Sequence, residues 1–405
     1  TFRCCKSETE AKEEVTMSII LPLPIADGRV APYTLSTAAH FPDRTTRPLN
    51  RVALAAAHVV ADPAADIDPW LKAAPDWERT IAYRTYLWDL GLGVAEAMDT
   101  AQRGMGLDWP MALELIKRSV AAARGRDGAV VFSGAGTDHL DLAGTQSVDK
   151  VIDAYEDQIA AIEAVGGRII LMASRALVRV AQSADDYARV YSQVLRQVRE
   201  PVIIHWLGDM FDPALAGYWG TRDLDQAMDT ALAIINGSAA KIDGVKISLL
   251  DKDREIAMRR RLDKRVKMYT GDDFNYAELI AGDSQGYSHA LLGIFDAIAP
   301  AAAAGLSSLA SGDLARFHAI LAPTVPLSRH IFRAPTQFYK TGVVFMAYLN
   351  GHQDHFTMVG GQESARSTLH LAELFRLADK AGLFRDPERA AARMKAVMAV
   401  RGVTG

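Results

Sequence analysis

Cysteine is nearly absent from this sequence. Both cysteines, Cys4 and Cys5, lie within the first five residues of a chain of 405. The remainder of the chain therefore contains no disulfide framework, no cysteine-ligated zinc site and no cysteine nucleophile.

A basic charge balance and long apolar runs are also lacking. The formal net charge is -4, which provides no positive field for nucleic acid. No apolar run reaches the roughly 20 residues needed to span a bilayer. We therefore expect a protein that acts on a small molecule and has no nucleic-acid or membrane partner.

The first 50 residues are predicted to form an N-terminal arm. Residues 1–16 are polar and charged and precede a start at Met17, so we expect them to be disordered or to come from vector or upstream sequence. They lack the apolar core of a secretory signal, which favours cytoplasmic residence. Residues 17–50 have few periodic apolar positions and are predicted to be irregular and to lie on the main fold.

Short apolar runs recur from Arg51 onward and alternate with amphipathic segments. Such alternation predicts parallel strands, because each crossover has to carry a helix back over the sheet. Eight runs over about 250 residues favour a (β/α)8 barrel. An open doubly wound sheet is the alternative, but no Gly-x-Gly-x-x-Gly motif follows the first run. The eight predicted strands are 51–59, 91–98, 128–134, 168–174, 201–207, 241–248, 265–271 and 287–293.

Helical apolar spacing fills the intervals between the predicted strands, and after Pro300 it is the only pattern. The predicted division is an arm at 1–50, a barrel at 51–305 and a C-terminal helical extension at 306–405. The predicted helices are 111–123, 151–165, 185–198, 224–235, 253–262, 276–281, 313–321, 338–348, 364–381 and 387–400.

Lys246 is the unusual residue at the predicted strand ends, where the catalytic groups of such barrels lie. A lysine within the apolar strand KIDGVKIS loses solvation, and burial lowers the pKa of its amine and makes it a nucleophile toward a carbonyl. An ion pair with Asp272 or Asp273 is the structural alternative. Other polar candidates at strand ends are His58, Asp99, Thr100, residues 134–139, Ser174, Arg175, His205, Ser248, residues 271–273, Ser288 and His289.

Four segments together resemble the dihydrodipicolinate synthase and N-acetylneuraminate lyase family of class I aldolases. They are SGAGTD at 133–138, PVIIHW at 201–206, GVKIS at 244–248 and GDD at 271–273, and the resemblance runs over roughly 51–350. It implies a barrel whose sixth-strand lysine, here Lys246, forms an imine with a 2-oxo acid such as pyruvate. It also implies a homo-oligomer, a dimer or tetramer, and no cofactor.

The sequence departs from that family at the motifs for proton transfer and carboxylate binding. The Tyr-Asn-x-Pro motif after strand five is replaced by His205 to Gly208, and no tyrosine occurs from 166 to 186. Of the Gly-Thr-Thr-Gly-Glu motif after strand two, only Thr100 matches cleanly. We therefore predict His205 as the proton carrier, because imidazole titrates near neutrality, and Thr100 as a carboxylate ligand.

The remaining site predictions concern substrate binding. Arg103 and Arg175 are candidate carboxylate clamps because a guanidinium binds that anion in a bidentate manner, and surface ion pairs are the alternative role for both. Gly134 and Gly136 would let the backbone approach a ligand. Ser248 and Asp272 complete the predicted site, whereas Asp273 is expected to cap the helix that follows it.

Two other functions stay open. Histidines and carboxylates at several strand ends could bind a divalent metal for a metal-dependent aldolase or hydrolase, although no His-x-His pair is present. A barrel that binds a ligand without turning it over would also have lost the motifs of an active family. The histidines and carboxylates in question are His58, His139, His205, His289, Asp99, Asp138, Asp209 and Asp272.

Overall fold

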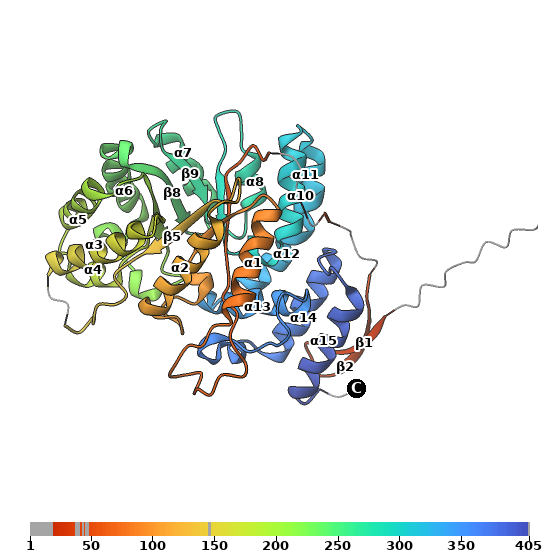
Figure 1. The fold of residues 1–405 in the computed structure, drawn as a ribbon. Helices are drawn as coiled ribbons and strands as arrows, with labels where there is room; N and C mark the ends of the chain where they lie inside the picture. Colours follow the sequence, from red (N-terminus) through yellow and green to blue (C-terminus); the bar gives the residue numbers. More distant parts are fainter. Residues whose placement is uncertain (1–18, 37–40, 43, 45–47, 145–146, 404–405) are drawn as a thin grey trace, which may run out of the picture.

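Eight parallel strands close into a barrel at the centre of the molecule (Figure 1). The computed structural model describes residues 19–36, 41–42, 44, 48–144 and 147–403. The order around the barrel is β10-β3-β4-β5-β6-β7-β8-β9, so each strand pairs with its neighbour in the sequence. The strands are β3 (Ala53–Ala56), β4 (Gly93–Glu96), β5 (Val131–Ala135), β6 (Arg168–Leu171), β7 (Val202–Leu207), β8 (Ile242–Ser248), β9 (Lys267–Thr270) and β10 (His289–Leu292).

The predicted (β/α)8 barrel is confirmed. Each of the eight apolar runs coincides with one barrel strand, although β5 extends one residue beyond its run, and all residues of β3, β4, β5 and β7 are buried. Burial on both faces explains why these strands are apolar throughout, because the interior and the helical layer both exclude water. A small cluster fills the interior, with Leu54, Phe132 and Tyr269 among its members.

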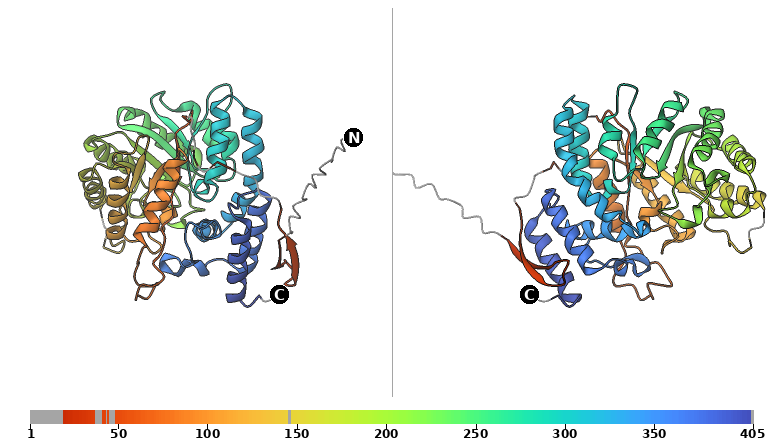
Figure 2. Two further views of the ribbon diagram at one scale, coloured as in Figure 1. Left: turned by 45° about the vertical axis from the view of Figure 1, so that its right-hand side comes forward. Right: turned by 180° about the vertical axis from the view of Figure 1, so that it is seen from behind.

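Helices surround the barrel between its strands (Figure 2). Most begin with an aspartate or serine whose side chain accepts a backbone N–H of the first turn, as Asp76 does from Arg79. The helices are α1 (Trp77–Asp89), α2 (Trp109–Ala123), α3 (Val148–Ala164), α4 (Arg175–Val180), α5 (Ala184–Gln197), α6 (Leu224–Gly237), α7 (Lys252–Arg261) and α8 (Tyr276–Ala281). Short 3₁₀ turns are η1 (Asp99–Ala101), η2 (Pro213–Leu215), η3 (Tyr218–Gly220), η4 (Ala239–Lys241), η5 (Ala322–Thr324), η6 (Thr336–Phe338) and η7 (Val359–Ser364).

The chain after β10 is helical, as predicted. The helix α13 lies at the centre of this extension, is buried along its whole length and contacts α9, α15 and η1. The predicted division at 305 falls inside α10, and the division of the chain into domains stays a prediction. The helices are α9 (Ile294–Ala297), α10 (Ala299–Ala310), α11 (Leu314–Leu321), α12 (Val325–Ile331), α13 (Tyr339–Leu349), α14 (Thr368–Lys380) and α15 (Pro387–Val400).

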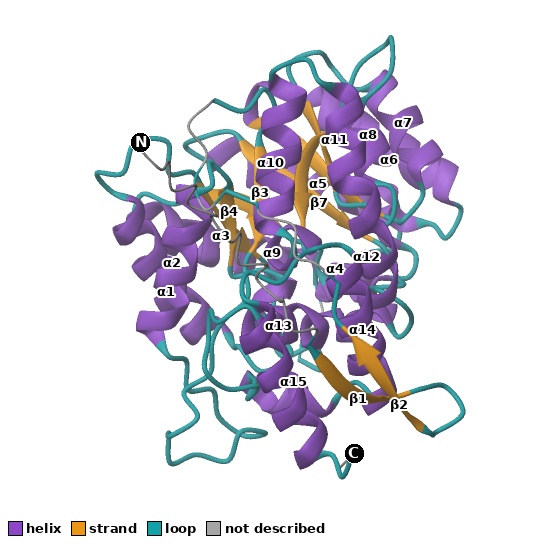
Figure 3. Cartoon of the chain, turned by 90° about the vertical axis from the view of Figure 1, so that its right-hand side faces the viewer, coloured by secondary structure: helices purple, strands orange, loops and turns teal. Residues whose placement is uncertain are grey.

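The N-terminal arm contains a β-hairpin, so the prediction of an irregular arm was wrong for this part. Strands β1 (Ile20–Pro24) and β2 (Val30–Thr34) pair in antiparallel fashion beside α14 and α15 (Figure 3). Leu21 and Leu23 are fully buried, and the Tyr33 hydroxyl donates to Asp379 Oδ2 at 2.7 Å. The apolar alternation is too short to distinguish from a loop in the sequence. The expectation for residues 1–16 lies outside the described residues.

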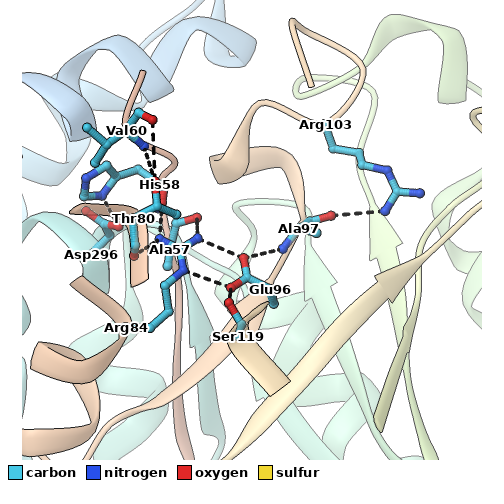
Figure 4. Close-up of polar contacts among 10 residues, drawn as sticks. All are labelled: Ala57, His58, Val60, Thr80, Arg84, Glu96, Ala97, Arg103, Ser119 and Asp296. Carbon is cyan, nitrogen blue, oxygen red and sulfur yellow. Dashed lines mark hydrogen bonds and ion pairs between the residues drawn. The ribbon is translucent and has the colours of Figure 1, made fainter. Parts of the chain in front are cut away.

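A buried ion pair holds the first two barrel strands and their helices together (Figure 4). Arg84 of α1 donates to both carboxylate oxygens of Glu96 on β4, at 2.9 and 2.8 Å, and neither side chain is exposed. Glu96 also accepts from Ser119 of α2 and, at 2.8 Å, from the backbone N–H of Ala97. The carboxylate therefore stabilises the turn at Ala97, whose φ is 52° and which leads into η1.

Among the described residues, none of the helices combines the length and the apolar character that crossing a membrane requires.

Replacing Arg84 with methionine is expected to lower the free energy of unfolding by about 3–5 kcal/mol, because Glu96 would remain buried without its partner. Urea unfolding followed by circular dichroism measures the change. Arg118→Met is the matched control, since its pair with Glu114 is exposed and should contribute under about 1 kcal/mol. Equal losses in the two variants would contradict this role for the buried pair.

Candidate active site

Lys246 lies inside the barrel near its C-terminal mouth. It occupies β8, the sixth strand of the barrel, and its register partners are His205 on β7 and Tyr269 on β9. The side chain is 8% exposed and lines a cavity of about 10 Å³, room for about one water molecule. The other lining residues are Ala56, Met98, Asp99, Thr100, Leu207, Phe211, Ser248, Asp273, Gly293, Phe332 and Tyr339.

Gly271 allows the lysine to lie in this position. A Cβ at this residue would lie 2.8 Å from Lys246 Cε and 2.7 Å from the carbonyl oxygen of Ile247. Any side chain here would displace the lysine or the strand beside it. The glycine of the GDD segment is therefore required by close packing beneath the amine.

The Lys246 amine is surrounded by charge but is not directly paired. Within the described part of the chain, its Nζ makes no hydrogen bond or ion pair, so the alternative of a pair with Asp272 or Asp273 is not observed. Burial lowers its pKa, while the nearby carboxylates of Asp273 and Asp99 act in the opposite direction. Burial also raises the pKa of Asp273 to about 7. A buried amine with a lowered pKa is the form that attacks a carbonyl.

The two aspartates of the GDD segment have roles opposite to those predicted. Asp272, not Asp273, stabilises the following turn: its Oδ1 accepts the N–H groups of Phe274 and Asn275, at 2.8 and 3.0 Å. Asp273 instead accepts the N–H of Ile294 at 2.9 Å and lines the Lys246 cavity. The capping prediction for Asp273 was therefore wrong: α8 has Asn275 as its N-cap residue and begins without a side-chain cap. The contacts of Asp272 give no support to its predicted role in substrate binding.

Tyr339 is the site residue that the sequence did not reveal. It begins α13, lines the Lys246 cavity and shares a hydrogen bond of 2.7 Å with Thr100 Oγ1. Its ring stacks on Phe332 at 4.3 Å between centroids, and burial raises the pKa of its phenol. The predicted Thr100 is thus at the site, with a phenol from the extension beside it. Nothing local marks Tyr339, because its partner is 239 residues away.

His205 is completely buried beside Lys246. Its Nε2 lies 3.2 Å from Ser248 Oγ, and its Nδ1 has no hydrogen-bond partner among the described residues. Burial and the neighbouring Lys246 lower the pKa of the imidazole well below its usual value. The ring is therefore neutral near pH 7 and can donate one proton or accept one.

Arg103 is buried and fully occupied by the protein. It forms two hydrogen bonds with Asp138, at 2.8 and 2.6 Å, and one with Gln158 at 2.7 Å. Its Nη1 donates to the carbonyl oxygens of Ala97 and Gly134, at 3.2 and 2.8 Å. These bonds use all five N–H donors of a guanidinium. Arg103 therefore has no free donor for the predicted role of carboxylate clamp.

A second and larger cavity of about 260 Å³, which we call the outer cavity, adjoins that of Lys246 over the ends of β4 to β7. Asp99 and Leu207 line both cavities. Arg175 lies at its edge, about half exposed and ion-paired with Asp212. Gly136 also lines it, whereas a Cβ on Gly134 would lie 2.6 Å from Met172 Sδ. The lining is Asp99, Arg103, Gly104, Gly136, Thr137, Asp138, Leu140, Leu142, Met172, Ala173, Arg175, Ala176, His205, Leu207, Asp212 and Leu215.

The histidines proposed as metal ligands have separate partners. His58 Nδ1 lies 2.8 Å from Asp296 Oδ2, His139 contacts Gln158, and His289 accepts the N–H of Val52. Across the residues that the structure describes, no three His, Cys, Asp or Glu side chains are grouped so as to hold a metal ion. The metal-dependent alternative thus lacks a ligand set among these residues.

The barrel fold is similar to that of dihydrodipicolinate synthases. The structure is similar to the pyruvate-complexed dihydrodipicolinate synthase of Acinetobacter baumannii, with a TM-score of 0.60, 15% identity and coverage of 82% of this chain and 99% of that one. The 4-hydroxy-tetrahydrodipicolinate synthase of Methylacidiphilum fumariolicum aligns with a TM-score of 0.60, 13% identity and coverage of 85% and 98%. At these identities the similarity establishes the fold and not the reaction.

The chain belongs to the family described as "Protein of unknown function (DUF993)", whose model matches residues 21–403. A comparison with curated proteins finds no match. The similarity to solved structures confirms the resemblance to dihydrodipicolinate synthases for the fold.

Replacing Asp273 with asparagine is expected to make the Lys246 amine more reactive above pH 7. The variant keeps an oxygen for Ile294 N but loses the charge that stabilises the protonated amine, so the pKa of Lys246 falls further. Reductive methylation with formaldehyde at pH 8, followed by peptide mass mapping, should show about threefold to tenfold faster labelling of Lys246.

Exposed Lys252, measured in the same digests, is the internal control. The difference should disappear below pH 7, where the wild-type Asp273 is protonated, because its pKa is about 7. Equal labelling rates of Lys246 at pH 8 would show that Asp273 does not act on the amine.

Proposed function

We propose that this protein is a carbon-carbon lyase or aldolase that forms a Schiff base between Lys246 and a 2-oxo acid such as pyruvate. The observation that carries this proposal is the buried Lys246 amine, which has a lowered pKa and no direct partner among the described residues and faces a cavity at the barrel mouth. In barrels of this kind catalytic groups lie at the C-terminal ends of strands. The resemblance to the dihydrodipicolinate synthase and N-acetylneuraminate lyase family supports the same reaction class.

The proposed chemistry begins with attack of the Lys246 amine on C2 of the 2-oxo acid. The resulting carbinolamine loses its hydroxyl group as water and becomes an imine. The cationic imine withdraws electrons, so a base can remove a proton from C3 to form an enamine. The enamine carbon then bonds to an aldehyde carbon, and water hydrolyses the new imine to free the product and the lysine. Cleavage is the reverse sequence.

Two groups can carry the protons. Tyr339 and Thr100 share a hydrogen bond in the Lys246 cavity, and the phenol remains protonated because its pKa is raised. We assign to Tyr339 the proton that leaves with the carbinolamine hydroxyl. His205, which lines the outer cavity and is neutral near pH 7, would take the C3 proton as the enamine forms and return it to the aldehyde oxygen. The hydroxyls of Thr100 and Ser248 are the proposed ligands of the oxo-acid carboxylate.

A barrel that binds a ligand without turning it over is the second candidate. The observation that favours it is the size of the Lys246 cavity, about 10 Å³, which a 2-oxo acid can enter only if side chains around it move. Phe211 and Phe332 lie at this cavity and contact each other at 6.3 Å between ring centroids. Cytoplasmic residence and a dimer or tetramer stay predictions.

Incubation with pyruvate and borohydride is expected to add one reduced pyruvate to Lys246, because hydride fixes the imine as a secondary amine. Peptide mass mapping locates the adduct. It must distinguish Lys246 from Lys340, a second buried lysine whose pKa burial lowers to about 8. Lys246→Ala should lose the adduct completely.

Lys252→Ala is the control for this experiment, since the exposed Lys252 pairs with Glu278 outside the barrel and should leave the adduct unchanged. An adduct on Lys340 alone would show that Lys340, and not Lys246, forms the imine. Activity that survives Lys246→Ala and is lost with a chelator would favour the metal-dependent alternative.

Tyr339→Phe is expected to slow exchange of the pyruvate methyl protons with deuterium by about 10² or more, as loss of a proton carrier does. Exchange reports imine and enamine formation without a second substrate, and NMR measures it. Tyr276→Phe is the control, because this buried tyrosine bonds to Thr324 away from the site. If exchange is slow in His205→Asn and normal in Tyr339→Phe, the proton that leaves with the carbinolamine hydroxyl would be assigned to His205 instead.

A further inference from the structure

The outer cavity is placed to receive a second reactant. It shares Asp99 and Leu207 with the Lys246 cavity, and His205, the register partner of Lys246, also lines it. At about 260 Å³ it is large enough for a small aldehyde but not for a macromolecular segment. A molecule bound there would lie against the open side of a lysine-bound enamine.

Aliphatic side chains form much of its wall. Leu140, Leu142 and Leu215 come from the segments that follow β5 and β7, and Met172 follows β6. Leu215 is buried, while Leu142 is 36% exposed and lies where solvent reaches the cavity. An apolar wall of this kind excludes water from a bound chain of carbon atoms and offers no partner to an anion.

The charged groups of the outer cavity are already compensated. Arg103 donates all five N–H groups to the protein, and its partner Asp138 keeps a lowered pKa as a result of that pair and despite burial. Arg175 pairs with Asp212 at the edge, so an anion beside this guanidinium would also meet a carboxylate. Asp99 adds a further negative group. No cation of the described lining is both buried and unpaired.

We propose, on the basis of the proposed function, that the outer cavity takes an uncharged aldehyde, one without a carboxylate or phosphate. Its carbonyl carbon bonds to C3 of the Lys246 enamine, and its oxygen takes the proton that the neutral His205 accepted from C3 when the enamine formed. Hydrolysis of the imine by water then releases a 4-hydroxy-2-oxo acid and the free lysine. The reaction joins one oxo acid to one aldehyde and needs no oxidant or reductant.

Butanal and 4-oxobutanoate test this proposal directly, because they have the same carbon chain and differ by one carboxylate. The full chain is incubated with pyruvate and each aldehyde, and the product is quantified by mass spectrometry. We expect kcat/KM to be at least ~10-fold higher for butanal, since an unpaired carboxylate is costly in a site without a free cation. A preference for 4-oxobutanoate overturns the proposal.

Leu142→Arg provides a positive test of the same reasoning. It adds a guanidinium to the wall at a partly exposed position, and should raise the 4-oxobutanoate to butanal ratio by about threefold or more. Leu224→Arg is the matched control: this leucine is 40% exposed on α6 and does not line the outer cavity. A ratio that rises equally in both variants, or in neither, counts against the assignment of the cavity.

Borohydride trapping with pyruvate separates the two levels of proposal. If Lys246 forms no adduct, the proposed function fails and this inference fails with it. Two outcomes would overturn only the assignment of an uncharged aldehyde. In the first, the adduct forms but neither aldehyde condenses. In the second, the adduct forms, 4-oxobutanoate is preferred, and that preference is lost in Arg175→Met.

Discussion

The hydrogen bond between Thr100 and Tyr339 is the contact on which the candidate site depends. It joins η1, at the end of the second barrel strand, to the first residue of α13, and the two are 239 residues apart. Because α13 is buried throughout, its position is set by packing over its full length and not by this bond alone. The helical extension thus completes the wall around Lys246, and the barrel without it would leave the amine open to solvent.

Buried polar pairs fix the turns that surround the lysine. Glu96, held by Arg84, accepts the N–H of Ala97 and so shapes the turn that leads to Asp99 and Thr100. On the opposite side of the amine, His58 pairs with Asp296 of α9. The N–H of Ile294, the first residue of α9, donates to Asp273. The turns that carry Asp99 and Asp273 are therefore held by other buried polar groups. Fixed charges shift the pKa of a lysine reproducibly, because the surroundings do not reorganise when it titrates.

The sequence was sufficient to predict the architecture and the position of Lys246 near the barrel mouth. Short apolar runs identify strands that are buried on both faces, and Lys246 interrupts one of them at the end where function is expected. Contacts between distant segments were not predictable in this way, and Tyr339 is the example. Asp272 and Asp273 show a different limit: both can form a turn, and only the backbone direction after β9 decides which side chain faces the amine. The hairpin of residues 20–34 was missed because two short strands carry little periodic signal.

This chain lacks the tyrosine that the dihydrodipicolinate synthase and N-acetylneuraminate lyase family carries after strand five. That absence does not by itself argue for lost activity. Proton transfer at an imine requires a proton carrier, such as a phenol or an imidazole, within reach of the reacting atoms, and the element that supplies it does not change the chemistry. Here a phenol reaches the Lys246 cavity from α13, and Thr100, the residue that matches the family motif, is its hydrogen-bond partner. If the proposed reaction holds, the helical extension supplies the phenol for proton transfer, and the apolar wall of the outer cavity selects the aldehyde.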